Sequence, residues 1–99
     1  MSILVGSVIL VEGDLDLASA PTLRTTLHAR IDAGEMHLVL DLSALDFLDS
    51  SGLGVLVGAA RRVRTEMGGT ITLVNPSASV LRLLELTRLG HVFAIEDQG

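Results

Sequence analysis

Two patterns of apolar residues alternate along the chain. Continuous apolar or β-branched runs at residues 8–11, 38–42, 70–74 and 92–95 are typical of strands. Between these runs, apolar residues recur every three or four positions, which predicts helices that begin near Ser19, at Asp49 or Ser50, and at Ser77 or Ser79. Strands that alternate with helices of this length form parallel βαβ units with right-handed crossovers. The pattern therefore predicts an α/β fold.

Local signals refine this prediction at the N-terminal end. The unbroken apolar run at 8–11 predicts a strand that is buried on both faces. The run Gly-Asp-Leu-Asp at 13–16 predicts a turn, and residues 43–45 predict a short connection. A short apolar run at 3–5 is either a first strand, which would pair antiparallel in a first hairpin, or a frayed end. We therefore expect one domain over residues 1–99, with a mixed but mostly parallel sheet and crossover helices.

The longest helix begins in the segment 46–54, Asp-Phe-Leu-Asp-Ser-Ser-Gly-Leu-Gly. Either Asp49 or Ser50 is suited to cap this helix, because both side chains accept a bond from a free backbone N–H. In either case Ser50 and Ser51 lie at the helix N-terminus, where free N–H groups and the helix dipole favour a phosphate. Asp46 and Asp49 oppose a phosphate by like-charge repulsion. A phosphoserine at this position is therefore compatible with an intact helix.

The two faces of this helix differ. One face is apolar along its length and is predicted to pack on the sheet; it comprises Leu53, Leu56, Val57, Ala60, Val63 and Met67. The opposite face is small and uncharged in its first two turns and becomes charged later; it comprises Gly54, Val55, Gly58 and Ala59, then Arg61 and Arg62. This face is either a docking patch rimmed by the two arginines or a surface covered by the domain's own loops. In the preceding helix, the outer face comprises Arg24, Thr25, His28 and Asp32.

The composition of the chain narrows the classes of molecule that we expect it to bind. The formal net charge is −5, the chain has neither Trp nor Tyr, and it has only two Phe residues. An acidic surface with few aromatic side chains disfavours nucleic acids and anionic membranes as partners. Cysteine is absent, which excludes disulfides and thiolate catalysis. No basic leader and no apolar run of membrane-spanning length is present, so we expect a cytoplasmic location.

The motifs of common enzymes are incomplete. Gly52-Leu53-Gly54 lacks the third glycine of a dinucleotide fingerprint, since position 57 is Val. A P-loop needs a lysine, and the chain has none; neither Ser50 nor Ser51 lies in a G-x-S-x-G elbow. Asp41, Asp46 and Asp49 could together hold Mg²⁺, but turn and cap roles fit them better. We therefore predict no enzyme activity, no catalytic residue, no metal site and no cofactor.

Several segments resemble the STAS domain, and more narrowly the bacterial anti-sigma factor antagonists, also called anti-anti-sigma factors. The matching segments are Gly13 to Asp16, Leu38 to Ser43, Phe47 to Gly54, Gly68-Gly69, Leu73 to Pro76 and Val80 to Leu89. The run Asp-Ser-Ser-Gly-Leu-Gly at 49–54 is the specific part of the resemblance. Arg88 departs from the family's pattern, which usually has glycine at this position.

The resemblance implies a partner-switching cycle. The unphosphorylated chain would bind an anti-sigma factor that is also a serine kinase, and this binding would release a sigma factor. The kinase, which holds the ATP and Mg²⁺, would phosphorylate Ser50, or as second choice Ser51, and a serine phosphatase would reverse the reaction. The expected contact residues are Asp14, Asp16, Asp46, Asp49, Ser50, Ser51, Gly52, Leu53, Gly54, Val55, Gly58, Arg61 and Arg62. The alternative is a STAS scaffold or subunit of a stressosome or lipid-transport assembly without a phosphoswitch.

Overall fold

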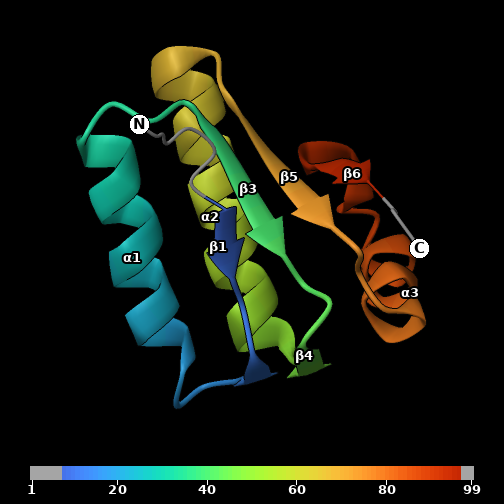
Figure 1. The fold of residues 1–99 in the computed structure, drawn as a ribbon. Helices are drawn as coiled ribbons and strands as arrows, with labels where there is room; N and C mark the ends of the chain where they lie inside the picture. The colour runs from blue at the N-terminus through green and yellow to red at the C-terminus, as the bar shows by residue number, and fades with distance from the viewer. Residues whose placement is uncertain (1–7, 97–99) are drawn as a thin grey trace.

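The three helices and the four strands of the main sheet follow one another as the apolar pattern predicts (Figure 1). The computed structural model describes residues 8–96. The strands are β1 (Val8–Leu10), β2 (Gly13–Leu15), β3 (His37–Asp41), β4 (Leu45–Leu48), β5 (Thr70–Val74) and β6 (Ala94–Glu96). The helices are α1 (Ala20–Asp32), α2 (Ser50–Met67) and α3 (Ala78–Thr87), with a short 3₁₀ turn, η1 (Gly90–Val92), before β6.

Four strands form the main sheet in the order β1-β3-β5-β6, and each neighbouring pair is parallel. The prediction of an α/β fold with crossover helices is confirmed. The antiparallel hairpin expected from the run at 3–5 lies outside the described residues. In Figure 1 the arrows of β3 and β5 point towards the end of the sheet at which α2 begins. The N-terminus of α2 therefore lies at the carboxyl end of the sheet, where α/β folds commonly place their functional groups.

The core lies between the sheet and the pair of helices α1 and α2. Every second residue of β3 and β5 is buried, and so are the inward residues of the helices; the set includes Leu38, Leu40, Ile71, Leu73, Leu27, Ile31, Leu56, Ala60 and Val63. The prediction that the first strand is buried on both faces is wrong. Ile9 is buried, but Val8 and Leu10 are 56% and 51% exposed, because α1 and α2 cover only one face of the sheet.

A second, two-stranded parallel sheet pairs β2 with β4. The sequence predicted a turn at 13–16, and this prediction is wrong for Gly13–Leu15, which form β2. The short connection predicted at 43–45 is present at residues 43 and 44, but Leu45 begins β4, a strand that the sequence did not predict. Gly13 does adopt a turn-like backbone, with φ of +69°. However, Leu15 and Leu45 are buried in the core, and this burial places the two segments side by side. Tertiary packing has therefore overridden the local turn signal.

One helix ends at a glycine, and another ends at a residue that is not glycine. Gly68, with φ of +68°, ends α2 in the left-handed conformation that glycine adopts without strain. At the end of α3 the same position is held by Arg88, with φ of +57°. The last strand begins at Ala94, two residues later than predicted, because residues 90–92 form the 3₁₀ turn. Within residues 8–96, no helix combines the length and the apolar character needed to cross a membrane.

Candidate functional site

The first turn of α2 presents Ser50 to solvent. Asp49 is the N-cap residue, and its carboxylate accepts a hydrogen bond of 3.0 Å from the backbone N–H of Gly52. Ser50 is the first helical residue and is exposed, whereas Ser51 is half-buried. Of the two hydroxyls, Ser50 is therefore the more accessible to a modifying enzyme.

The small β2–β4 sheet packs against this end of α2. The backbone N–H of Asp49 donates a bond of 3.2 Å to the carbonyl oxygen of Leu15 on β2. A Cβ atom on Gly52 would lie 2.6 Å from both Cγ and the carbonyl oxygen of Leu15, and 2.8 Å from Cδ1 of Leu48. Such contacts are shorter than real carbon atoms allow, so only glycine fits at position 52.

Two of the residues expected to contact a partner lie beneath the surface. Gly52 is buried against the small sheet, and the Leu53 side chain is only 4% exposed within the core. Both residues pack inward and hold the first turn of α2 against the small sheet and the core. A direct contact of either residue with a partner stays a prediction. Asp14 and Asp46, by contrast, are exposed, and Asp16 and Asp49 are half-buried.

The turn from Asp14 to Ser19 is closed by hydrogen bonds. The Asp16 carboxylate accepts bonds from the backbone N–H groups of Ser19 and Ala18, at 3.1 and 3.0 Å. The Ser19 hydroxyl donates to the carbonyl oxygen of Asp14 at 2.7 Å. The bond from the Ser19 N–H, followed by the other bonds to Asp16, lowers the pKa of the Asp16 carboxyl below its usual value. Ser19 precedes α1 as predicted, but its side chain closes this turn instead of capping the helix.

The outer face of α2 divides into an open part and a covered part. Gly54 and Gly58 are exposed, and a Cβ atom on either would meet only open space. Together with half-buried Val55 and with Arg24 and His28 of α1, they line a hollow of about 340 Å³. Ala59, predicted on the same outer face, is fully buried. The first two turns of this face are therefore open while Ala59 is covered, and the docking of a partner on the open part stays a prediction.

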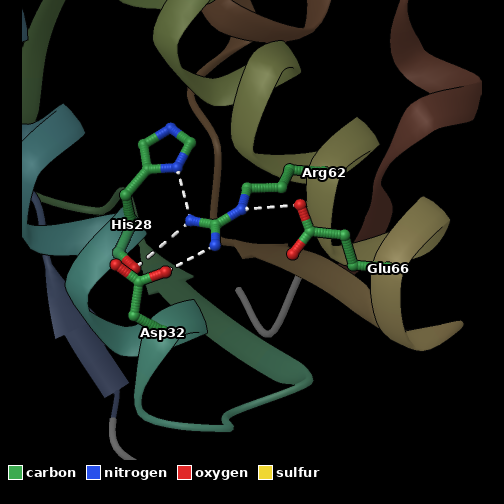
Figure 2. A network of polar contacts seen from close by, with 4 residues as sticks. All are labelled: His28, Asp32, Arg62 and Glu66. Atoms are coloured by element: carbon green, nitrogen blue, oxygen red, sulfur yellow. Dashed lines mark hydrogen bonds and ion pairs between the residues drawn. The ribbon is translucent and has the colours of Figure 1, made fainter.

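Arg62 connects α2 to α1 (Figure 2). Its guanidinium donates hydrogen bonds to the carboxylates of Asp32 and Glu66 and, at 2.9 Å, to the ring nitrogen Nδ1 of His28. The bond to Asp32, followed by the bond to Glu66, raises the pKa of Arg62. Because a guanidinium only donates, His28 accepts through Nδ1 and carries its ring proton on Nε2.

This network bears on two predictions. Arg62 was expected on the rim of a docking patch; its donors are engaged within the molecule, and its contact with a partner stays a prediction. Asp32 lies on the outer face of α1 as predicted, with its side chain 66% exposed, and His28 is half-buried there; both bind Arg62. Arg61 remains exposed, as predicted.

The carboxylates near the end of β3 are not gathered into a metal-binding group. The Asp41 carboxylate accepts a bond of 2.9 Å from the backbone N–H of Ser43, which is the main cause of the lowered pKa of Asp41. Asp49 serves as the helix cap described above. Within residues 8–96, no three His, Cys, Asp or Glu side chains lie close enough to hold a metal ion together.

Sequence reasoning missed several residues of this surface. Arg24 and His28 line the hollow beside α2. The sequence placed both on the outer face of α1 but did not assign them to this site, because the contact depends on how the two helices pack. Leu17 and Phe47 are large apolar side chains that are 76% and 52% exposed. An apolar residue in a turn was the only available signal for Leu17.

Comparisons with known proteins agree with this geometry. The family model of the STAS domain matches residues 4–98. The anti-sigma-B factor antagonist of Bacillus subtilis is 35% identical over 89 residues, which are 90% of this chain and 80% of that protein.

Solved structures of such antagonists are also similar. An anti-sigma factor antagonist from Mycobacterium paratuberculosis superposes with a TM-score of 0.82 and 29% identity, over 96% of this chain and 80% of that one. The phosphorylated form of SpoIIAA, a Bacillus cell fate determinant, gives a TM-score of 0.75 and 27% identity, over 93% of this chain and 81% of that one. With a family model that matches nearly the whole chain and a fold shared with these antagonists, the chain belongs to the STAS domain family.

Proposed function

We propose that the chain is an anti-sigma factor antagonist whose binding is switched off by phosphorylation of Ser50. The observation that carries this proposal is an exposed hydroxyl on the first residue of α2, beside the open surface of Gly54 and Gly58. Relatives with the same domain are anti-sigma factor antagonists. The related SpoIIAA is known in a phosphorylated form, which supports a phosphoserine in this fold.

The proposed partner is an anti-sigma factor that is also a serine kinase. The unphosphorylated chain binds it through the first turns of α2 and the adjacent segment 14–16 at the end of β2, and the sigma factor is thereby released. The kinase supplies ATP and Mg²⁺, and the chain itself is a substrate and not an enzyme. A serine phosphatase restores the hydroxyl. Since the proposed partner controls transcription, we place the chain in the bacterial cytoplasm.

The electrostatics of the helix end explain how a phosphate acts on binding and not on the fold. Phosphorylation adds about −1.5 to −2 charges at neutral pH. The free N–H groups and the dipole of α2 stabilise these charges in the unbound chain. In a complex, the same charges would be buried beside Asp46 and Asp49 and within an apolar contact, at a cost of several kcal/mol unless paired. The modified chain therefore keeps its fold and loses its partner.

The test uses the anti-sigma factor kinases of the host bacterium, each purified and incubated with the chain and ATP. One kinase should place a single phosphate on Ser50, mapped by mass spectrometry. Ser50→Ala should bind this kinase but resist release by ATP, and Ser50→Asp should bind at least about tenfold more weakly. Ser51→Ala is the matched control and should still be phosphorylated at Ser50. Phosphate on neither serine, or full affinity of Ser50→Asp, would contradict the proposal.

A further inference from the structure

Two large apolar side chains are exposed on the acidic surface around Ser50. Leu17 is 76% exposed and is the most exposed large apolar side chain of residues 8–96; Phe47 is 52% exposed. Phe47 pairs with Asp14 across the β2–β4 sheet, and both are exposed, whereas the next pair, Leu15 and Leu48, is buried and half-buried. Phe47 therefore occupies the solvent face of this small sheet.

The turn that carries Leu17 is closed before any partner binds. Asp16 and Ser19, which flank Leu17, exchange hydrogen bonds between their side chains and backbones, including one of 2.9 Å from the Asp16 N–H to the Ser19 hydroxyl. Holding a residue in a fixed turn removes much of the conformational entropy that it would lose on binding. The fixed turn therefore preorganises Leu17 for binding. Because its side chain is exposed, Leu17 does not contribute to the core.

Both side chains lie close enough to Ser50 for a single partner to cover all three residues. The Leu15 carbonyl oxygen lies 3.2 Å from the Asp49 nitrogen. Chain geometry then keeps the Cα atoms of Leu17 and Ser50 within about 15 Å, and those of Phe47 and Ser50 within about 11 Å. A standard protein interface covers about 800 Å² on each partner, which is roughly 30 Å across.

We propose that Leu17 and Phe47 are the apolar anchors by which the Ser50 kinase binds this chain, and that the kinase receives them in apolar pockets rimmed by Arg or Lys. The inference rests on the proposed function. The basic rim follows from the surface, because the two anchors lie among Asp14, Asp16, Asp46 and Asp49 in a chain of net charge −5. Anionic lipid would be repelled by these carboxylates. A protein that is complementary in shape and charge is the occupant that fits.

The test compares Leu17→Ala and Phe47→Ala with Leu86→Ala. Leu86, on α3, is 72% exposed and serves as the matched control for loss of an exposed leucine. Affinity for the purified kinase is measured by calorimetry without ATP, and the rate of Ser50 phosphorylation by mass spectrometry. Leu17→Ala and Phe47→Ala should each bind about tenfold or more weakly and be phosphorylated more slowly at subsaturating kinase. Leu86→Ala should match the wild type.

Circular dichroism and thermal unfolding show whether each variant is folded, so that a loss of affinity can be assigned to the interface. Leu17→Ala should unfold like the wild type, because little of its side chain is buried. Wild-type affinity of a folded Leu17→Ala, or an equal loss in Leu86→Ala, would overturn the inference while leaving the Ser50 switch intact. If no host kinase binds or phosphorylates the wild type, the proposed function itself fails. A rise in salt should weaken wild-type binding, and salt-independent affinity would contradict the basic rim.

Discussion

The backbone N–H of Asp49 donates a hydrogen bond to the carbonyl oxygen of Leu15, with a distance of 3.2 Å between nitrogen and oxygen. This bond joins the residue that caps α2 to the strand β2, which lies more than thirty positions earlier in the chain. It brings the hydrogen-bonded turn at residues 14–19 next to Ser50. Two acidic segments that are separate in sequence therefore form one surface.

Gly52 packs closely against Leu15 and Leu48, whereas Gly54 faces open space. This difference predicts opposite effects of alanine at the two positions. Gly52→Ala should destabilise the fold by about 1–3 kcal/mol, because its Cβ would collide with Leu15 and Leu48. Gly54→Ala should stabilise it by about 0.5–1 kcal/mol, because position 54 is open and alanine favours a helix. Chemical denaturation measures both values. Equal effects of the two substitutions would show that the first turn of α2 does not pack on the small sheet.

A negative charge at Ser50 should leave the helix intact. In Ser50→Asp the carboxylate lies at the positive end of the helix dipole, which favours it by about 0.3–1 kcal/mol, while Asp46 and Asp49 oppose it. The two terms are similar in size, so the far-UV circular dichroism and the unfolding midpoint should stay close to those of the wild type. A large loss of helical signal would mean that the charge acts on the fold.

The network of Arg62 should matter for stability, whereas its neighbour Arg61 should not. Arg62→Ala removes the bonds to Asp32, Glu66 and His28 and leaves α1 less firmly held against α2. Its unfolding midpoint should fall below that of the wild type, and the difference should shrink in concentrated salt. Arg61→Ala, which replaces an exposed side chain, is the control and should unfold like the wild type.

Asp16 should contribute stability that depends on pH. Its pKa is lowered in the folded chain by the bonds from Ser19 and Ala18. A carboxyl group with a lowered pKa stabilises the fold above its unfolded pKa of about 3.9, and this contribution is lost as pH falls through the folded pKa. Asp16→Asn should therefore be less stable than the wild type at pH 7, and the two should converge in acid. Denaturation at a series of pH values checks this, and a difference that does not change with pH would contradict it.

Arg88 offers a site for stabilisation. Its φ of +57° places a side chain in the left-handed conformation that ends α3. Arg88→Gly should stabilise the fold by about 1 kcal/mol, because glycine adopts this conformation without strain. Arg82→Gly, within the same helix, is the control and should destabilise by about 1 kcal/mol. Thermal unfolding distinguishes the two, and a loss of stability in Arg88→Gly would mean that the Arg88 side chain makes a favourable contact.

Elements with local signals could be predicted from the sequence. The three helices, the strands of the main sheet and a cap of α2 at Asp49 or Ser50 all follow from apolar periodicity and from residues that favour helix ends. These signals act between residues a few positions apart, so they can be read along the chain. They also placed Ser50 at a helix N-terminus, which is the basis of the proposed switch.

Contacts between distant segments, by contrast, depend on how the whole chain packs. Gly13–Leu15 forms a strand because Leu15 is buried and β4 lies beside it, although its local sequence favours a turn. Arg62 binds α1, and Ala59 is buried, because two helices pack side by side. The exposure of Leu17 likewise depends on its neighbours in the folded chain, which the apolar pattern does not predict. Burial and pairing between distant residues are properties of the packed chain, and they decide which side chains of a functional surface are open to a partner.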